Sequence, residues 1–572
     1  MVRKQVIKQP EPSKVSALAR GLPCTRITAS VLVNRGITTV RQARSFLDST
    51  VADLPSPFSI RDMDTAAGRI CKAIENREII MVFGDYDADG ITSTAILVEF
   101  LKHAGARVKY YIPHRIMEGY GLKREHIASV AAKEKATLLI TVDCGISSHE
   151  AAEACRESGI DLVITDHHKT ESALPPALAV VNPSRADCPS GLSCLAGVGV
   201  TFYLLIALRA MLREKGFWNK IPEPNLKACC DLVAIGTVAD IVPLVGANRI
   251  LVKTGLEMIN NRCRPGIEAL IETAKLKRPA ITSEDVAFRL APRINAPGRI
   301  DHALRALELL RADSREETAR LAGLLNRLNT RRQAIEEDIY SEISQVLLDR
   351  GHRMKNMRTI VLAHRQWHQG VIGIAASKAA RRYCMPVALI AVNGDIGIGS
   401  ARSIPGLDLY RVLKSCARLL EDFGGHEQAA GFKIKTENIP AFEKQFEYKV
   451  NMETGPEDFI SSVDVDCELP FSAITPKLLD EITALQPFGT GNPEPIFFAD
   501  NIRVVSSTML NNRHRRMSLI QPGGNRPIDA IQFNTPQKQV NTGFFRRVLF
   551  RLRQNTWNRS GGPRLVIEDV TA

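Results

Sequence analysis

The chain has 572 residues, too many for a single hydrophobic core, and 45% hydrophobic with 24% charged residues is an ordinary globular composition. Its formal net charge of +13 is compatible with a polyanionic partner but does not prove one. The twelve cysteines form no C-x-x-C pair, the N-terminus has no apolar signal core, and the longest apolar stretch is interrupted by Arg209. We therefore expect a cytoplasmic protein of several domains, without structural zinc, export or a membrane span.

Residues 1–60 contain short helical stretches separated by Pro and Gly, and we expect an N-terminal cap there. Between 61 and 312, strand-like runs alternate with helical stretches. The predicted strands are 79–83, 107–112, 138–142 and 162–165, with helices at 92–103 and 148–158. This alternation predicts an α/β fold with a doubly wound, mostly parallel sheet.

Acidic residues follow several of the apolar runs. Asp85, Asp87 and Asp89 come directly after the first run, and Asp143 follows residues 138–142. Two more groups, Asp166-His167-His168 and Asp240, follow 162–165 and 235–239, and we predict that 235–239 is also a strand. Because ligands bind beyond the carboxyl ends of parallel strands, we expect these side chains to converge. Carboxylates so close repel one another unless a cation neutralises them.

Oxygen ligands with one or two imidazoles suit Mn²⁺ or Mg²⁺, and two ions fit the number of carboxylates. Two such ions activate a water, neutralise phosphoryl oxygens and stabilise the leaving oxygen. Adjacent His167 and His168 diverge, so we expect only one of them to be a ligand. The absence of a G-x-x-x-x-G-K-[ST] loop predicts hydrolysis without nucleotide fuel.

The rest of the chain has three regions. Residues 313–350 carry apolar residues at helical spacing and predict one or two connecting helices. Residues 351–455 predict a second α/β domain with strands at 359–362 and 386–392. Residues 456–572 contain short strands and turns, which predict a small OB-like β-barrel.

The predicted barrel is strongly basic. Residues 501–572 contain twelve Lys or Arg and only three acids, as expected of a platform for single-stranded nucleic acid. Aromatic side chains lie among these charges, and we expect about half of them to be core residues: Phe533, Phe544, Phe545, Phe550 and Trp557.

Four short motifs carry a family resemblance. In chain order they are Asp85-Tyr86-Asp87-Ala88-Asp89-Gly90, Asp143-Cys144-Gly145, Asp166-His167-His168 and Thr237-Val238-Ala239-Asp240. They resemble the ordered motifs of the DHH phosphoesterase superfamily. Further segments are similar to its bacterial exonucleases specific for single-stranded DNA: 195–199, 292–299, 367–373, 399–403, 424–426 and 487–494. The resemblance covers residues 60 to 535.

The resemblance implies a 5′→3′ exonuclease that hydrolyses single-stranded DNA processively in DNA repair and recombination, using Mn²⁺ or Mg²⁺. It assigns one set of residues to the metals, with Asp143 as the bridge: Asp87, Asp89, Asp143, His167 and Asp240. Asp85 and His168 would assist catalysis beside the metals.

This chain departs from the superfamily at Phe83. Many members have a metal-binding histidine four residues before the middle aspartate, where this chain has Phe83. The first metal site would then be completed differently, by Asp85 or by water.

The resemblance makes the second α/β region a DHH-associated domain, which recognises the DNA end across a groove from the metals. Arg299, Ser400 and Arg402 would hold a 5′-terminal phosphate, because an arginine fork matches phosphate oxygens. His426 would lie against the nucleotide backbone. The alternatives are a structural salt bridge for Arg402 and a buried packing role for His426.

The expected partner is single-stranded DNA with a 5′ end, bound by a monomer. The resemblance also suggests single-strand binding protein and a RecQ-type helicase. One alternative is an enzyme of the superfamily that hydrolyses short oligonucleotides or pyrophosphate, although such an enzyme needs no basic barrel. The other is a non-catalytic DNA-binding relative, which would be expected to lose metal-site acids that this chain retains.

Overall fold

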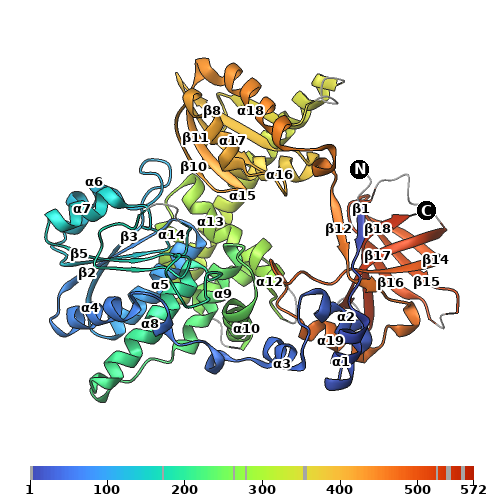
Figure 1. The fold of residues 1–572 in the computed structure, drawn as a ribbon, viewed down its shortest axis with the longest axis horizontal. Coiled ribbons are helices and arrows are strands. Elements are labelled where there is room, and N and C mark those ends of the chain that lie inside the picture. Colours follow the sequence, from blue (N-terminus) through green and yellow to red (C-terminus); the bar gives the residue numbers. More distant parts are fainter. Residues whose placement is uncertain are drawn as a thin grey trace. The chain divides into compact units, whose positions relative to one another are not determined.

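The strands of the first α/β region form one parallel sheet in the order β3-β2-β4-β5-β6, which confirms the predicted fold class (Figure 1). The computed structural model describes residues 4–169, 173–261, 264–276, 280–351, 357–523, 526–535, 543–555 and 561–571. The strands of this sheet are β2 (Ile79–Gly84), β3 (Arg107–Tyr111), β4 (Leu138–Val142), β5 (Asp161–Thr165) and β6 (Ala179–Val181). The interior strands β2, β4 and β5 are almost entirely buried, as in sheets that helices cover on both faces.

Helices follow these strands along the chain. Those of the sheet region are α4 (Met63–Glu75), α5 (Ala88–His103), α6 (Arg124–His126), α7 (His149–Glu157), α8 (Gly197–Glu214), α9 (Cys230–Ala239), α10 (Gly246–Asn261), α11 (Pro265–Thr273) and α12 (Ser283–Asp285). The prediction of a strand at 235–239 was wrong, because this segment is the end of α9. Residues 230–238 are buried on every side of that helix, and a short apolar run of this kind has no periodicity that distinguishes helix from strand.

Contacts between residues divide the chain into two units, and each is described by itself. Unit 1 contains residues 4, 112–120 and 292–462, and unit 2 contains residues 5–111, 121–291 and 463–571. The parallel sheet described above belongs to unit 2.

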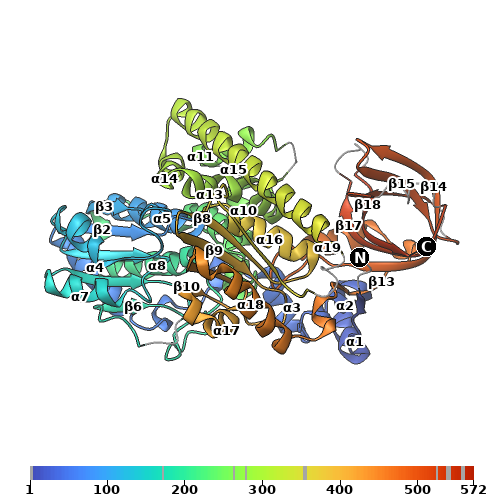
Figure 2. The same ribbon diagram turned by 90° about the horizontal axis from the view of Figure 1, so that it is seen from above.

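Unit 2 also contains a closed barrel. Its strands are β13 (Cys467–Glu468), β14 (Phe497–Leu510), β15 (His514–Ile520), β16 (Ile528–Gln532), β17 (Phe544–Gln554) and β18 (Pro563–Thr571). Their order is β13-β14-β15-β16-β18-β17, and an additional pairing of β14 with β17 closes the barrel (Figure 2). The closure removes unpaired strand edges, and it confirms the predicted OB-like architecture.

The N-terminal segment packs on this barrel. It contains β1 (Lys4–Ile7), which was not predicted and pairs with β12 (Ser462–Val465), followed by α1 (Pro12–Gly21), α2 (Arg26–Asn34) and α3 (Val40–Asp48). Leu18 and Leu32 share one hydrophobic core with Phe497 and Phe550 of the barrel and with Leu478 of α19 (Pro476–Ala484). The N-terminal helices are thereby stabilised by burial of apolar surface.

Unit 1 is built on a mixed sheet of order β10-β11-β9-β8-β7, in which only β7 and β8 are parallel. Its elements are α13 (Ala291–Ile300), α14 (Leu304–Arg311), α15 (Arg315–Arg350), β7 (Ile360–His364), α16 (Ile372–Tyr383), β8 (Val387–Asn393), β9 (Ile396–Arg402), α17 (Leu409–Ser415), β10 (Leu420–Gly425), β11 (Ala429–Lys435) and α18 (Ile439–Glu453). The connecting region, predicted as one or two helices over residues 313–350, forms a single 36-residue helix, α15. Ile343 and Leu347 at its end pack with Ile372 and Ala376 of α16.

Across the part of the chain that the structure describes, we find no helix with the length and apolar character needed to cross a membrane.

Candidate metal centre

The acidic segments singled out in the sequence meet at the carboxyl edge of the parallel sheet in unit 2. Gly84 of β2 lies opposite Val142 of β4, and Val142 lies opposite Thr165 of β5. The residues that follow these three strands are therefore neighbours in space. Asp240 reaches the same place from the C-terminal end of α9 rather than from a strand.

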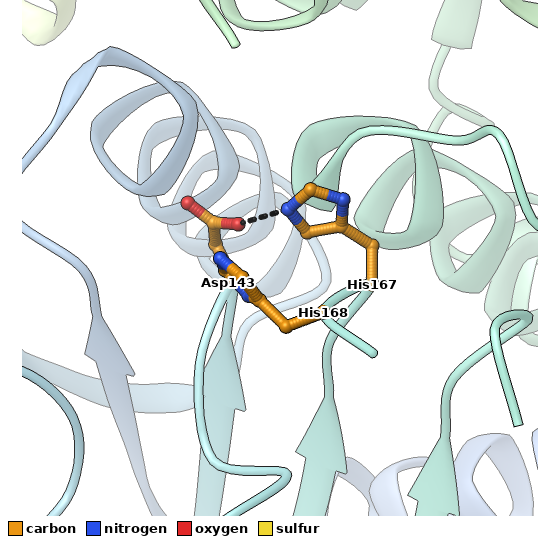
Figure 3. Close-up of side chains that lie close together, drawn as sticks. All are labelled: Asp143, His167 and His168. Carbon is orange, nitrogen blue, oxygen red and sulfur yellow. Dashed lines mark ion pairs between the residues drawn. The ribbon is translucent and has the colours of Figure 1, made fainter. Parts of the chain in front are cut away.

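The His167 ring is the geometric centre of the cluster. Its Nε2 lies 3.2 Å from Oδ1 of Asp143, 3.6 Å from Oδ2 of Asp240 and 4.0 Å from Oδ2 of Asp89. Figure 3 shows the ring of His167 turned toward the Asp143 carboxylate. Residues that are up to 151 positions apart in the chain thus face one small volume.

Three overlapping groups have ligand atoms within 4.8 Å of one another. Asp143 belongs to two of them and His167 to two, and of these only the Asp143 carboxylate has two oxygens with which it could serve two ions. The groups are Asp143–His167–His168, Asp89–His167–Asp240 and Asp85–Asp87–Asp143. The structure therefore brings together all seven residues that were predicted as metal ligands or catalytic residues, while their individual roles stay predictions.

The first turn of α8 holds Asp89 in place. The backbone N–H groups of Gly197 and Val198 donate to its two carboxylate oxygens at 2.7 and 2.8 Å. An anion at a helix N-terminus is favoured by the unsatisfied N–H groups and by the helix dipole. A Cβ on Gly197 would lie 2.3 Å from Oδ1 of Asp143, so only glycine allows α8 to approach so closely.

The two carboxylate oxygens of Asp87 can serve different purposes, one in capping a helix and the other in binding a ligand. Its Oδ1 accepts hydrogen bonds from the N–H groups of Asp89 and Gly90, which caps α5. The cap fixes where the helix begins and therefore where Asp89 points. The second oxygen of the Asp87 carboxylate remains available to a ligand.

Burial and mutual repulsion shift the pKa values of the carboxylates upward. Burial raises the pKa of Asp89 to about 7, with a further contribution from the Asp87 charge. Burial, followed by the charges of Asp89 and Asp87, raises the pKa of Asp240 to about 9. The pKa of Asp143 is raised well above its ordinary value by burial and by the surrounding carboxylates. The cluster is thus strained electrostatically in its ionised form.

His167 is neutral near pH 7, because burial, aided by the charge of His168, lowers its pKa to about 4. Among the described residues its Nε2 has no hydrogen-bond partner, and this atom faces the carboxylates of Asp143 and Asp240. Because the ring is neutral near pH 7, its close contact with Asp143 is not a salt bridge at that pH.

These features fit a divalent cation. Oδ1 of Asp143 and Nε2 of His167 are buried and form no hydrogen bond with any residue that the structure describes, although buried polar atoms are rarely left in that state. The donors are carboxylate oxygens and imidazole, which suit Mn²⁺ or Mg²⁺.

Asp166 is a functional residue that the sequence reasoning did not assign. It is completely buried, and its Oδ1 accepts hydrogen bonds from the backbone N–H groups of His167 and His168 and from Nδ1 of His168 at 2.7 Å. Burial alone would lower the pKa of His168, but the hydrogen bond and charge of Asp166, with further carboxylates, raise it to about 9. His168 is therefore protonated near pH 7. The sequence did offer a sign of this role, because Asp166 is the first residue of the third motif, in which only the two histidines were assigned roles.

Phe83, where many superfamily members have a histidine, is a core residue. It is 1% exposed, and its ring centroid lies 5.1 Å from that of His126 and 5.8 Å from that of Tyr111. Asp85 is close to Asp87 and Asp143, which agrees with its suggested replacement of the missing ligand.

The four residues predicted to bind the DNA end all belong to unit 1. Arg402 at the end of β9 donates from Nη1 to Oγ of Ser400 at 3.0 Å and from Nε to Oγ of Ser377 at 2.9 Å. Among the described residues it forms no ion pair with a carboxylate, which argues against the salt-bridge alternative for Arg402. Burial, with a contribution from Arg115, lowers the pKa of Arg402 to about 10, as expected of a cation without a counter-ion.

The other two residues predicted to bind the DNA are Arg299 and His426. Arg299 donates to the carbonyl oxygen of Gly370 at 3.3 Å. His426 is exposed in the turn between β10 and β11, so the alternative of a buried packing role for it is wrong.

The barrel is less uniformly basic at its surface than its sequence suggested. Several of its arginines form ion pairs, and Arg515 is fully buried. The pairs are Arg516–Asp529, Arg547–Asp500, Arg551–Glu494 and Arg553–Glu494. Phe545 and Phe550 are core residues, whereas Phe533 and Phe544 are each 49% exposed; Trp557 lies outside the described residues. Half of the four described aromatics are thus free to contact a base.

Three family models match the chain in order: the DHH family N-terminal domain at 79–237, the DHHA1 domain at 356–452 and the RecJ OB domain at 465–569. The single-stranded-DNA-specific exonuclease RecJ of Bacillus subtilis is 36% identical over 571 residues, which are 99% of this chain and 70% of that protein. The crystal structure of RecJ from Thermus thermophilus in complex with Mn²⁺ matches with a TM-score of 0.84 and 31% identity, over 100% of this chain and 79% of that one. Its complex with Mg²⁺ matches with a TM-score of 0.77 and 29% identity, over 100% and 78%.

Proposed function

The chain belongs to the RecJ family of single-stranded-DNA-specific exonucleases, and from this we propose that it hydrolyses single-stranded DNA processively from the 5′ end. The observation that carries the proposal is the convergence of four distant motifs on the Nε2 atom of His167, with the buried Oδ1 of Asp143 beside it. Metal-dependent hydrolysis of a phosphodiester needs such a concentration of oxygen and nitrogen ligands, and a DNA-binding scaffold does not.

The residues that would hold Mn²⁺ or Mg²⁺ are the carboxylates and the imidazole of the cluster: Asp87, Asp89, Asp143, His167 and Asp240. Two such ions, when bound, activate a water, neutralise phosphoryl oxygens and stabilise the leaving oxygen. The N–H groups of Gly197 and Val198 orient Asp89. The protein thus supplies a prearranged site, which lowers the reorganisation needed during the reaction.

His168 is the proposed acid of the site. Asp166 keeps its ring protonated near pH 7, so Nε2 can donate a hydrogen bond to a phosphate oxygen or a proton to the leaving oxygen. Asp85 is proposed to complete the first metal site in place of the absent histidine.

In unit 1, Arg402, Ser400 and Arg299 are proposed to bind the 5′-terminal phosphate, and His426 to contact the nucleotide backbone. The support is that Arg402 is a half-buried cation whose hydrogen bonds go to hydroxyl and carbonyl oxygens, so its charge is available to an anion.

The barrel is proposed to bind the strand that is being degraded. Phe533 and Phe544 present exposed rings on which bases can stack, and each stacked base contributes about 1–3 kcal/mol. Holding the strand between cuts would make the next cut faster than release.

Further expectations about the cellular role stay proposals. They are a cytoplasmic monomer acting in DNA repair and recombination, with single-strand binding protein and a RecQ-type helicase as partners. The division into residues 1–60, 61–312, 313–350, 351–455 and 456–572 likewise stays a prediction.

The decisive experiment is Mn²⁺-dependent digestion of strands labelled at the 5′ or the 3′ end, single and double. We expect immediate release of the 5′ label from single strands, slow shortening of the 3′-labelled strand, and neither reaction in EDTA. Cleavage restricted to oligonucleotides of a few residues would contradict the proposal and favour the small-substrate alternative. Binding of DNA without any cleavage would favour the non-catalytic alternative.

A further inference from the structure

A second concentration of charge lies in unit 2 among residues outside the metal centre. A cavity of about 440 Å³ is lined by α3, by the first turns of α10 and by the residue that follows α2. Four cations line it, and no acidic residue does: Arg35, Arg41, Arg249 and Lys253. A volume of this size is within the range of small-molecule sites in proteins.

The cations are held in place by uncharged oxygens. Arg249 donates to the carbonyl oxygens of Phe46, Leu485 and Ala484, and its guanidinium lies 3.7 Å from the centroid of the Phe46 ring. Lys253 donates to the carbonyl oxygen of Leu47 at 2.8 Å. These bonds fix the positions of the side chains but do not neutralise their charge.

Arg35 is likewise held by uncharged oxygens that do not neutralise its charge. It donates to the side chain of Asn492 and to the carbonyl oxygen of Pro493, while its buried Nε has no hydrogen-bond partner. Asp466 acts on it only through space, and within the described ranges none of the four cations forms an ion pair with a carboxylate.

Uncompensated buried charge is costly, and it is normally paired. Burial lowers the pKa of Arg35 to about 10, and burial with the charge of Arg35 lowers that of Arg249 to about 10. If Arg249 served only to connect backbone carbonyl groups, the three further cations beside it would have no function. An anion in the cavity would remove the repulsion.

The remaining lining atoms fit a phosphate on a nucleotide. Val245 and Gly246 at the first turn of α10 line the cavity, and first-turn N–H groups have no acceptor within their own helix. Ser45 and Ser49 add hydroxyl groups, and Ile37 and Ile250 add apolar walls. Cations, hydroxyls and apolar surface together match the parts of a nucleotide, whereas a bare inorganic anion would not use the apolar walls.

We propose that this cavity, formed by α3, α10 and Arg35, binds the phosphate of a nucleotide, either a free nucleoside monophosphate or one residue of a DNA strand. The site does not use the metal ligands and does not depend on the proposed cleavage reaction. Arg41 is the residue best suited to a test. Its side chain is exposed at the cavity, and it forms no hydrogen bond or ion pair with any described residue.

The test measures binding of thymidine 5′-monophosphate to the full chain in EDTA by calorimetry, with uncharged thymidine as the ligand control. Arg41→Ser is expected to weaken binding about tenfold, the effect of losing one charge-assisted hydrogen bond. Arg44→Ser is the matched control, because Arg44 is exposed on the same helix but does not line the cavity. Circular dichroism of both variants verifies that α3 is intact.

A second arm distinguishes the two sources of the phosphate. If a DNA strand occupies the cavity, Arg41→Ser will reduce the salt dependence of oligothymidylate binding by about one charge, and the oligonucleotide will displace the monophosphate. If the ligand is a free nucleotide, oligothymidylate binding will be unchanged in Arg41→Ser while monophosphate binding is weakened about tenfold. Equal binding of both ligands by Arg41→Ser and Arg44→Ser would overturn the proposal, whether or not the chain cleaves DNA.

Discussion

The Nδ1 atom of His168 and the Oδ1 atom of Asp166 are joined by a 2.7 Å hydrogen bond, and the Asp166 carboxylate is completely buried. The bond raises the pKa of His168 to about 9 against the effect of burial. A histidine in such a pair keeps its proton at the pH where the enzyme is expected to work.

The substitution Asp166→Asn tests this relationship. A folded pKa raised above the unfolded value means that the proton is lost only as the pH rises through about 9. Without the carboxylate the proton is lost at lower pH, so the alkaline limb of kcat/KM should move to lower pH while the acidic limb stays. The measurement is a kcat/KM profile with Mn²⁺ between about pH 6 and 10. An unchanged alkaline limb in a folded variant would show that His168 is not the acid.

The substitution Asp143→Asn should raise the stability of the chain in EDTA while it lowers the rate of DNA cleavage. Since the pKa of Asp143 is raised, its contribution to stability is complete below its unfolded pKa and is lost as the pH rises through the folded value. In EDTA at pH 8, Asp143→Asn should therefore have a higher Tm than the natural chain, and the difference should vanish near about pH 4.

The same variant should lose more than about 100-fold in cleavage, a larger effect than the loss of an outer partner of a metal ligand. Thermal melts in EDTA and digestion with Mn²⁺ check the two outcomes. A variant that is less stable than the natural chain at pH 8 would contradict the electrostatic account.

Gly197→Ala tests how closely α8 must approach the metal centre. The added Cβ would lie 2.3 Å from Oδ1 of Asp143, so the helix or the carboxylate must move. We expect Mn²⁺ affinity and cleavage to fall by about 10–100-fold. Gly199→Ala is the control on the same helix, because its Cβ would meet only the end of the Leu195 side chain, at 3.1 Å. Calorimetric titration with Mn²⁺ compares the two, and equal affinities would argue against the role of this contact.

Arg402→Ala tests recognition of the DNA end. If Arg402 binds the terminal phosphate, the variant should lose about tenfold or more in kcat/KM on 5′-phosphorylated strands and much less on 5′-hydroxyl strands. Arg382→Ala, an exposed arginine on α16, removes the same charge from unit 1 and should change neither. Equal losses on both substrates would show that Arg402 supports the fold of unit 1 rather than the end of the strand.

Much of the fold followed from local patterns. The runs that became β2, β4 and β5 are mostly apolar, as buried parallel strands are, and an acid directly follows each of them. The helix α15 was predictable because its apolar residues recur at helical spacing without proline. The strand predicted before Asp240 was wrong because α9 is surrounded by other elements and has no polar face to show its period.

The amino-acid sequence by itself predicted which residues converge in the candidate metal centre, because each motif places its acids at the end of a buried element. Only the tertiary structure decided how they act. It placed Asp166 behind His168, set the first turn of α8 against Asp89, and left Nε2 of His167 facing carboxylates.

The distribution of charge likewise depends on the tertiary structure. The sequence counts twelve basic residues in the last 72 positions, but ion pairs in the barrel neutralise several of them. Among the described residues, Arg402 and the four cations around Arg249 form no ion pair with a carboxylate, and Arg35, Arg41, Arg249 and Lys253 lie in none of the segments that carry the family resemblance. Pairing depends on distances between residues far apart in sequence, and those distances exist only once the chain has folded.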